Sequence, residues 1–245
     1  MAKTLHPNQI HAISHGTGPM LVLAGPGSGK TTVIIQRIRR LTEKMGVSPY
    51  RILVITFTKA AAEQMKTRYA ALQGKTGVMF GTFHSIFFRI LRQACGYSLE
   101  QVLSEDERRN TMQKLVTEAR ISVQDQEEYI QQFFSQYSLM KNQLQDVSDF
   151  MPEGLPKDEF VALTKKFDGW KRRNEKMDFD DMLTECYEVL SQDEKTRKMW
   201  QDRFDYILVD EFQDVNRAQY ACLQMLAAPK NNLFVVGDDL SLIHI

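Results

Sequence analysis

A glycine-rich stretch between residues 24 and 31 restricts the possible folds of this chain more than any other feature. Because glycine has no Cβ, consecutive backbone N–H groups can converge on phosphates, and a helix that follows adds the positive end of its dipole. Lys30 then neutralises the β- and γ-phosphates, and the Thr31 hydroxyl is a ligand for Mg²⁺. The stretch therefore predicts a site for a nucleoside triphosphate and Mg²⁺. Its residues are Ala24, Gly25, Pro26, Gly27, Ser28, Gly29, Lys30 and Thr31.

The residues on either side supply the strand and the helix that such a loop needs. Met20–Leu23 is a short apolar run typical of a buried strand, and Thr31–Leu41 carries apolar residues at helical spacing. Ala24 stands where the strict pattern has glycine. The alternative interpretation is a glycine-rich turn that only leads into a helix.

Length and composition limit the class of protein without deciding its partner. With 245 residues the chain suits one large domain or two of ordinary size. Lys plus Arg and Asp plus Glu both number 31, so a polyanion must be met by a local patch or by backbone groups. Cys95, Cys186 and Cys222 lack the paired spacing of a metal site. Since the sequence has no signal pattern and no apolar run of membrane length, we expect a soluble cytoplasmic protein.

Three strand-then-helix units open the chain. After the glycine-rich unit, Ile52–Ile55 leads into a helix over about 59–71, and Val78–Phe80 leads into another over about 83–94. Parallel strands with helical crossovers predict an α/β fold with a doubly wound sheet. Ligands of such sheets gather at the carboxyl ends of the strands.

The middle of the chain has the character of an all-helical segment. Ser104 with Glu107 predicts a capping box at one helix start, and Asp125 predicts the cap of another. Further helices are predicted around residues 160–173 and 179–190. Because strand character returns only near residue 206, the helices form an insertion into the α/β domain.

Strand character returns at Tyr206–Val209 and Leu233–Val236, and acidic residues follow both strands. Both strand ends should lie on the same rim as the glycine-rich loop. The predicted domains are an α/β domain in two parts, residues 1–96 and 205–245, and a helical insertion over residues 97–204.

Asp210 and Glu211 discriminate among the uses of a phosphate-binding loop. An Asp at a strand end beside the loop can hold Mg²⁺ through water, and an adjacent Glu can accept a proton from water that attacks the γ-phosphate. A Glu base favours hydrolysis, and it argues against a kinase, for which the chain has no recognisable acceptor site. The alternative role for Glu211 is to cap the next helix.

Several motifs, taken in order, resemble those of the UvrD/Rep/PcrA-like superfamily 1 DNA helicases. Residues 24–31 match motif I, Asp210–Asp214 matches motif II, and Leu5–Gln9 looks like the Q-motif, whose glutamine contacts adenine. Asp178–Met182 looks like the acidic and aromatic motif that precedes the second half of the domain. The resemblance implies a RecA-like P-loop NTPase domain, called 1A, interrupted by a helical insertion, called 1B. It also implies an ATP-dependent motor of 3′ to 5′ polarity that translocates on single-stranded DNA and unwinds duplexes at single-strand/duplex junctions.

The resemblance assigns roles to individual residues of the ATP site. The implied catalytic residues are Lys30, Thr31, Asp210, Glu211 and Gln213, with Gln213 also the link between the nucleotide and DNA sites. The implied Mg²⁺ ligands are Thr31 and Asp210. The implied nucleotide contacts are Gln9, Ala24, Gly25, Pro26, Gly27, Ser28, Gly29, Lys30, Thr31 and Thr32, the last at a position that is often Arg in relatives.

Motifs that resemble Ia and Ib imply a path for single-stranded DNA. Rings after strands can stack on bases, which contributes about 1–3 kcal/mol per base, and hydroxyls can position phosphates. Without the resemblance, Phe57 and Phe83 would both be assigned to the core. A basic and aromatic cluster over residues 165–176 can line a DNA path or be a solvated helix face. The implied DNA contacts are Thr56, Phe57, Thr58, Thr82, Phe83 and His84.

The end of the chain departs from the family pattern. Ser241 and His244 stand where motif III has a Gln and an aromatic residue. We expect an N-terminal fragment of a longer helicase, with a tail over residues 240–245 that resembles adaptor read-through. Because the second RecA-like domain and its arginines would be missing, ATP should bind but be hydrolysed poorly. The alternative is a natural one-domain regulatory module that binds nucleotide and DNA without turnover.

Overall fold

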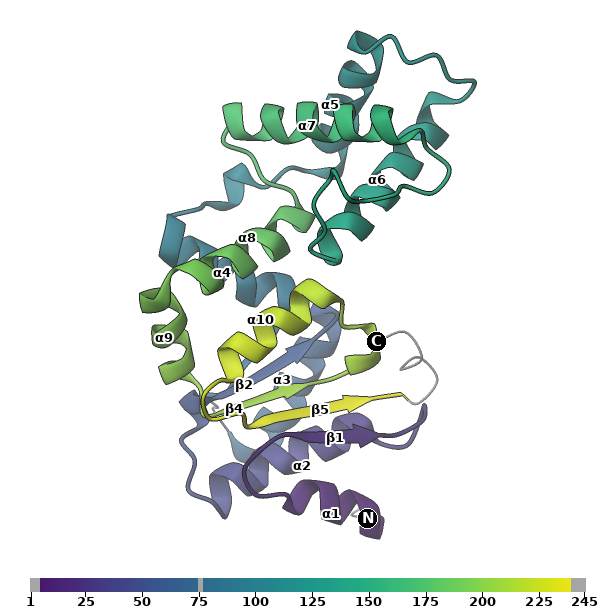
Figure 1. Cartoon of the computed structure of the whole chain (residues 1–245). Coiled ribbons are helices and arrows are strands. Elements are labelled where there is room, and N and C mark those ends of the chain that lie inside the picture. The colour runs from purple at the N-terminus through teal and green to yellow at the C-terminus, as the bar shows by residue number, and fades with distance from the viewer. Residues whose placement is uncertain (1–4, 75–76, 239–245) are drawn as a thin grey trace. The chain divides into compact units, whose positions relative to one another are not determined.

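Five parallel strands form one sheet among residues 5–74 and 77–238, which are the residues described by the computed structural model (Figure 1). The order of the strands is β1-β5-β4-β2-β3. Each predicted strand is confirmed within two residues at either end, so the α/β class with a parallel sheet is confirmed. The strands are β1 (Met20–Leu23), β2 (Ile52–Thr56), β3 (Met79–Thr82), β4 (Tyr206–Val209) and β5 (Leu233–Gly237).

The strand order brings together segments that lie far apart in the sequence. Leu23 of β1 pairs with Gly237 of β5, and Val235 of β5 pairs with Val209 of β4. The glycine-rich loop and both acidic strand ends therefore lie side by side at the carboxyl edge of the sheet, as predicted. The ends of β2 and β3 continue the same edge.

Strand β1 differs from the prediction of a buried strand. Leu21 and Leu23 are each 48% exposed, whereas every residue of β2, β4 and β5 is buried. The reason is that β1 lies at the end of the sheet order, where alternate side chains find no covering helix.

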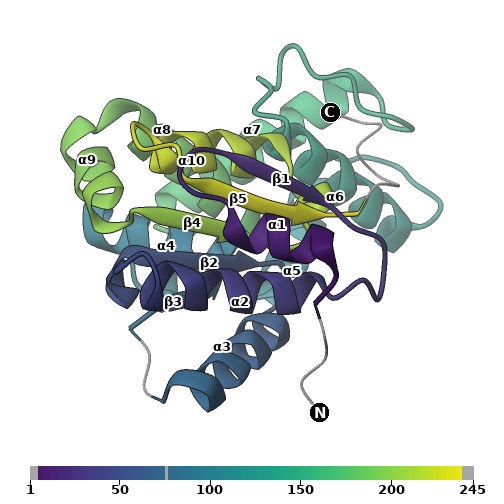
Figure 2. The ribbon, with the colours of Figure 1, turned by 90° about the horizontal axis from the view of Figure 1, so that it is seen from below.

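The sheet belongs to the first of two units, here called the sheet unit, whose described residues run through Ile86, from Leu190 to Val215, and from Tyr220. Figure 2 shows α1, α2 and α3 on one face of the sheet and α10 on the other. Buried Ile34 and Ile38 of α2 pack with Val54 and Phe234 of the sheet. The α-helices with most of their residues in this unit are α1 (Pro7–Ser14), α2 (Lys30–Glu43), α3 (Lys59–Gln73), α9 (Glu194–Arg203) and α10 (Arg217–Ala227), and η1 (Pro49–Arg51) and η3 (Phe212–Asp214) are short 3₁₀ turns.

The second, helical unit comprises Phe87–Val189 and Asn216–Gln219 and has its own aromatic-rich core. The predicted capping box is present, because Glu107 N donates to Ser104 Oγ at 3.2 Å and Ser104 N donates to the Glu107 carboxylate at 3.0 Å. Asp125 caps the next helix as predicted. Its elements, two of which extend into the sheet unit, are α4 (Phe83–Cys95), η2 (Leu99–Gln101), α5 (Glu105–Glu118), α6 (Gln126–Asn142), α7 (Lys157–Arg173) and α8 (Phe179–Gln192).

The main segment of the helical unit is residues 87–189, whereas the predicted insertion is residues 97–204. The unit therefore begins ten residues before the predicted start and ends 15 residues before the predicted end. The assignment of the units to 1A and 1B stays a prediction. Among the described residues, no helix is long and apolar enough to cross a membrane. The tail from residue 239 onward, with Ser241 and His244, lies outside the described residues.

Candidate functional site

The glycine-rich loop turns back over the start of α2 with two glycines in the left-handed region. Gly27 has φ 74° and Gly29 has φ 88°, which side chains with a Cβ rarely adopt. Gly29 caps α2, so Lys30 is the first residue of that helix. A Cβ on Gly29 would also lie 3.1 Å from Gln9 Nε2. Glycine at this position therefore serves both the backbone turn and a close approach.

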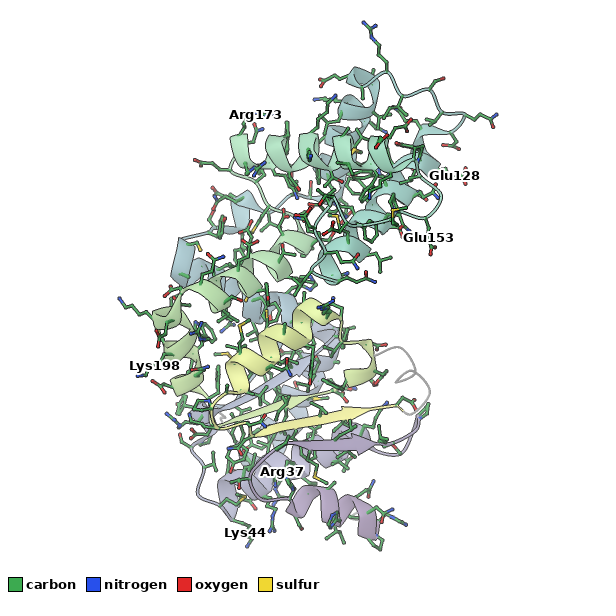
Figure 3. The ribbon with its side chains drawn as sticks, viewed as in Figure 1. Arg37, Lys44, Glu128, Glu153, Arg173 and Lys198 are labelled. Atoms are coloured by element: carbon green, nitrogen blue, oxygen red, sulfur yellow. The ribbon has the colours of Figure 1, made fainter. Side chains whose placement is uncertain are left out.

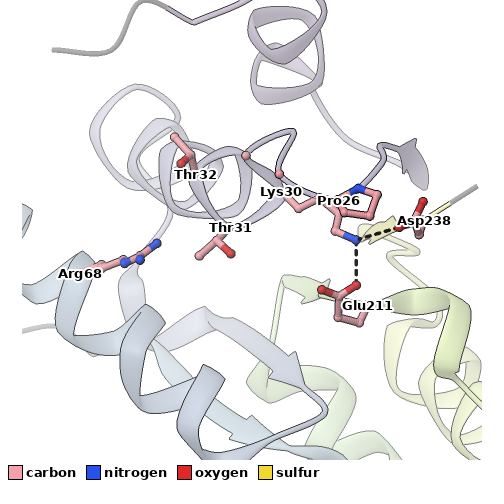
Figure 4. A pocket seen from close by; sticks show the side chains of 9 residues that line it. Pro26, Lys30, Thr31, Thr32, Arg68, Glu211 and Asp238 are labelled. Carbon is pink, nitrogen blue, oxygen red and sulfur yellow. Dashed lines mark hydrogen bonds and ion pairs between the residues drawn. The ribbon is translucent and has the colours of Figure 1, made fainter.

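An open pocket of about 450 Å³ lies against this loop (Figure 4). Figure 4 shows Arg68, which comes from α3, across the pocket from Glu211 and Asp238. Volume, backbone donors and cations suit a polyphosphate at a helix N-terminus. The residues that line the pocket are Pro26, Gly27, Gly29, Lys30, Thr31, Thr32, Arg68, Glu211 and Asp238.

Lys30 is held by the acidic strand ends. Its Nζ donates to Glu211 Oε2 at 2.8 Å and lies 3.9 Å from Asp238 Oδ2. Burial opposes the charge of the ammonium, but the hydrogen bond and charge of Glu211, with smaller effects of Asp238 and Asp210, outweigh burial and raise the pKa of Lys30. The lysine is therefore fully charged and already paired with a carboxylate.

Glu211 is fixed by its backbone and by two side chains. It adopts φ 50° and ψ 47°, a strained conformation for a residue with a Cβ. Burial tends to raise the pKa of Glu211, but hydrogen bonds from Gln213 and Lys30 lower it below its usual value. Gln213 Nε2 donates to Glu211 Oε2 at 2.9 Å, and Asp238 N donates to Gln213 Oε1 at 2.9 Å. Gln213 thus connects the end of β4 to the end of β5.

Asp210 is buried at the end of β4 with one oxygen unsatisfied. The side chain is 5% exposed, and its Oδ1 has no hydrogen-bond partner among the described residues. Burial, then the charge of Glu211, raises the pKa of Asp210 to about 6. An orphaned buried carboxylate oxygen is an unfavourable arrangement that a cation or its water ligand would relieve.

Gln9 contacts the loop from α1. Its Nε2 donates to Ser28 O at 2.8 Å, and its Oε1 accepts from His6 N at 2.9 Å to close a capping box on α1. The contacts with other described residues leave one N–H and one lone pair of the amide available. Gln9 lines a second cavity of about 280 Å³, with Val22, Leu23 and Ala24 among its other lining residues. The cavity has an apolar wall and an amide, which suits a planar heterocycle.

The six residues predicted to contact DNA are the last residues of β2 and β3 and the residues that follow them, but their side chains differ in exposure. Phe83 is only 2% exposed, and its ring meets the half-buried Phe57 edge-on at 5.6 Å. Stacking of Phe83 on a base would require its side chain to move, so Phe57 is the more accessible ring. Thr56 is also buried, and its hydroxyl donates to Thr58 O at 2.9 Å.

Two of the remaining three, Thr58 and Thr82, have local roles at helix starts. The Thr58 hydroxyl accepts from Ala61 N at 3.1 Å and caps α3. The Thr82 hydroxyl accepts from Ser85 N at 3.2 Å at the start of α4, and His84 is half-buried beside it. DNA contact by any of the six residues stays a prediction.

The basic cluster over residues 165–176 splits into two sets. Lys171 is 3% exposed and forms ion pairs with Asp181 at 2.6 Å, Asp178 at 3.1 Å and Asp168 at 3.3 Å, so it cannot line a DNA path. These contacts also give the acidic motif at residues 178–182 a structural role inside the helical unit. By contrast, the four exposed cations of the cluster form no ion pair with another described residue, although the charge of Lys165 contributes to the lowered pKa of Asp146; they are Lys165, Lys166, Arg172 and Arg173.

The fold brings Lys30, Thr31, Glu211, Thr32 and the loop backbone to one pocket, as expected from sequence. Arg68 was not predicted, because an exposed arginine on a helix gives no distinctive sequence signal. It becomes visible only when α3 packs beside the loop. Arg68 makes no ion pair with another described residue, so its charge is available to a ligand.

Comparison with known proteins gives one consistent family. The sequence profile described as the UvrD/REP helicase N-terminal domain matches residues 5–243. The putative ATP-dependent DNA helicase YjcD of Bacillus subtilis is 36% identical over 249 residues, which cover 96% of this chain and 32% of that protein. ATP-dependent DNA helicases PcrA of Staphylococcus epidermidis and Staphylococcus aureus are 35% and 34% identical, over 97% and 96% of this chain. The chain spans about a third of the length of these curated relatives.

Proposed function

This chain belongs to the UvrD/REP helicase N-terminal domain family, and on that premise we propose that it is the ATP-binding part of an ATP-dependent DNA helicase. The complete motor would couple hydrolysis to 3′ to 5′ movement on single-stranded DNA and to unwinding at single-strand/duplex junctions. Relatives with helicase names support the class of activity. Movement also requires a second RecA-like domain, which closes and opens against the first around ATP.

The observation that carries the proposal is the contact of Lys30 with Glu211 at 2.8 Å in the loop pocket. When a triphosphate enters, its β- and γ-oxygens offer Lys30 a stronger partner than one carboxylate. Lys30 then leaves Glu211, and the glutamate is freed beside the γ-phosphate. Binding of the substrate thereby exposes the base that the reaction needs.

Thr31 and Asp210 fit the role of Mg²⁺ ligands, the first directly and the second through water. The support is the unsatisfied buried Oδ1 of Asp210 and the oxygen-only character of the two side chains. No cluster of three or more carboxylate, His or Cys ligands occurs in the described part of the chain, which suits an ion held largely by phosphates and water. Bound Mg²⁺ would neutralise charge that develops on the phosphates.

Glu211 is the proposed general base. Glu211 is ionised near neutral pH in the unliganded structure, and once Lys30 turns to the phosphates the carboxylate is free to accept a proton from the attacking water. Gln213 holds the same carboxylate and the backbone at the end of β5, so a change at the γ-phosphate is passed to the neighbouring strand end. Gln9 is the proposed adenine contact in the cavity of about 280 Å³. Arg68 adds a cation for the phosphates or the ribose.

Single-stranded DNA would cross the ends of β2 and β3, where Thr58, Phe57 and His84 are at least partly accessible. Duplex DNA at a junction would meet the four exposed cations of α7, because unpaired surface cations neutralise phosphates without reading sequence. These contacts belong to separate units and are proposed independently of one another.

The test is DNA-stimulated ATP hydrolysis by the protein at the length of its relatives. Glu211→Gln should lower kcat by about 10²- to 10⁴-fold while ATP still binds, because it removes the base and keeps the shape. Glu194→Gln, an exposed residue at the start of α9, is the matched control and should hydrolyse ATP at the parent rate. Parental turnover by Glu211→Gln would refute the assigned base.

A further inference from the structure

A buried arginine occupies the middle of α2 in the sheet unit. Arg37 is 1% exposed and forms no ion pair with any described residue (Figure 3). Since an unpaired buried charge is unfavourable, it persists only where other groups replace the lost water. The groups that replace water around the guanidinium show which part of the fold Arg37 holds in place.

Backbone carbonyls at the end of α1 accept hydrogen bonds from both Nη atoms of the guanidinium, whereas its buried Nε has no hydrogen-bond partner among the described residues. Its Nη1 donates to Ile13 O at 3.1 Å and to His15 O, and its Nη2 donates to Gly16 O at 2.7 Å. Ile13 is in the last turn of α1 and His15 is its C-cap, so their carbonyls lie at the negative end of the helix dipole, and Gly16 follows directly. Arg37 therefore clamps the carboxyl end of α1 against α2.

Two aromatic rings from the sheet complete the environment. The Arg37 guanidinium carbon lies 5.5 Å from the ring centre of Phe234 and 6.0 Å from that of Tyr206. Both separations are within the range of a cation–π contact. Since Phe234 lies on β5 and Tyr206 on β4, the arginine joins α1 and α2 to the sheet.

This arrangement links the two helices that contribute to the nucleotide site, namely α2 with Lys30 and α1 with Gln9. Lys30 and Arg37 are seven residues apart on α2, so they are separated by about two turns on one side of the helix. Gln9 is in the first turn of α1, whose last turn Arg37 holds. An eight-residue helix is marginal by itself and takes its position from such contacts.

We propose that Arg37 is a positioning residue for nucleobase recognition: it fixes α1 so that Gln9 meets the base when Lys30 holds the phosphates. The inference rests on the proposed role of Gln9 and deepens it. Arg37 touches neither the base nor the phosphates. Its effect is to make the base-reading helix and the phosphate-binding helix move as one body.

The experiment compares the affinities of the 245-residue chain for ATP and GTP by titration calorimetry. Arg37→Lys keeps the charge and the aliphatic stem but loses the forked geometry. It should lower the ratio of ATP to GTP affinity by about 3- to 10-fold, the size of one or two lost hydrogen bonds. Affinity for GTP, which depends on Lys30, should stay near that of the parent. Hydrogen exchange of the α1 amides should speed up, while that of β4 and β5 should not.

A double-mutant cycle with Gln9→Ala separates the possible outcomes. If Arg37 acts through Gln9, Arg37→Lys should not change the ATP to GTP ratio further in the Gln9→Ala background. An unchanged ratio in Arg37→Lys, in a chain where Gln9→Ala lowers it, would overturn the positioning role. A ratio that Gln9→Ala leaves unchanged would instead refute Gln9 as the base reader. Loss of folding by Arg37→Lys would also overturn the proposal, because the side chain would then support the fold as a whole.

Discussion

Replacing Asp210 by asparagine should stabilise the unliganded chain, although it removes a residue that the reaction needs. The Asp210 carboxylate is buried, and its pKa is raised from 3.8 to about 6 by burial and by Glu211. A carboxyl group with a raised pKa in the folded state favours folding when protonated, below pH 4. That contribution is lost as the pH rises through about 6. Asparagine keeps the shape without the charge.

The expected gain follows from the size of the shift. A difference of about 2 pKa units corresponds to about 3 kcal/mol of unfolding free energy at pH 8, and the linkage relation reduces it to about half of that at pH 5. For a unit of this size, about 3 kcal/mol raises Tm by about 6–12 °C. The assay is urea unfolding of the parent and Asp210→Asn at pH 8 and pH 5, followed by circular dichroism.

A matched control has the opposite sign. Asp205 forms ion pairs with Arg51 and Lys230. The hydrogen bond from Arg51 lowers the pKa of Asp205 to about 2; burial opposes this effect, and Lys230 adds to it. Its contribution is present above pH 4 and is lost as the pH falls through about 2. Asp205→Asn should therefore destabilise by about 1 kcal/mol at pH 8 once solvent screening is allowed for. A loss of stability in Asp210→Asn at pH 8, or a gain that does not change with pH, would refute the reasoning.

Three further predictions concern DNA, nucleotide and the helical unit. Phe57→Ala should weaken single-stranded DNA binding by about 10-fold in fluorescence anisotropy. Phe83→Ala should mainly lower the unfolding free energy, by about 3–5 kcal/mol, and the reverse pattern would contradict the exposure assigned to the two rings. Arg68→Ala should weaken ATP binding by about 3- to 10-fold in calorimetry, and Lys66→Ala on the same helix, which pairs with a neighbouring carboxylate outside the pocket, should not. Lys171→Met should destabilise the helical unit by about 3–5 kcal/mol, because three carboxylates lose their buried partner; an unchanged urea midpoint would disprove that role.

The sequence predicted those parts of the fold that are set by short-range patterns. The five strands are short apolar runs bounded by turns, and Ser104 and Asp125 cap helices by contacts three residues away or less. Helices α1, α9 and α10 were not predicted. α9 has few apolar residues to mark a period, and α1 is short, so both depend on tertiary contacts.

The site residues that lie at or just after the ends of strands could be predicted from the sequence. Lys30, Glu211 and Asp210 meet because parallel strands share one edge. Arg68 and Arg37 were missed because each acts across a helix interface, and nothing in the local sequence separates such an arginine from a solvated one. The resemblance implied DNA contact for Phe83, whereas the interpretation from residue type alone, which assigned it to the core, agrees with its burial against Phe57.

The most direct test of the central claim is Mg²⁺-dependent ATP binding to the 245-residue chain by titration calorimetry, with Lys30→Ala and Glu211→Gln as variants. Lys30→Ala should weaken binding by about 10- to 100-fold, because charge-assisted contacts to the phosphates are lost. Glu211→Gln should bind at least as tightly as the parent, because it removes the carboxylate that holds Lys30 in the absence of ligand. Equal affinity of the parent and Lys30→Ala would contradict the account.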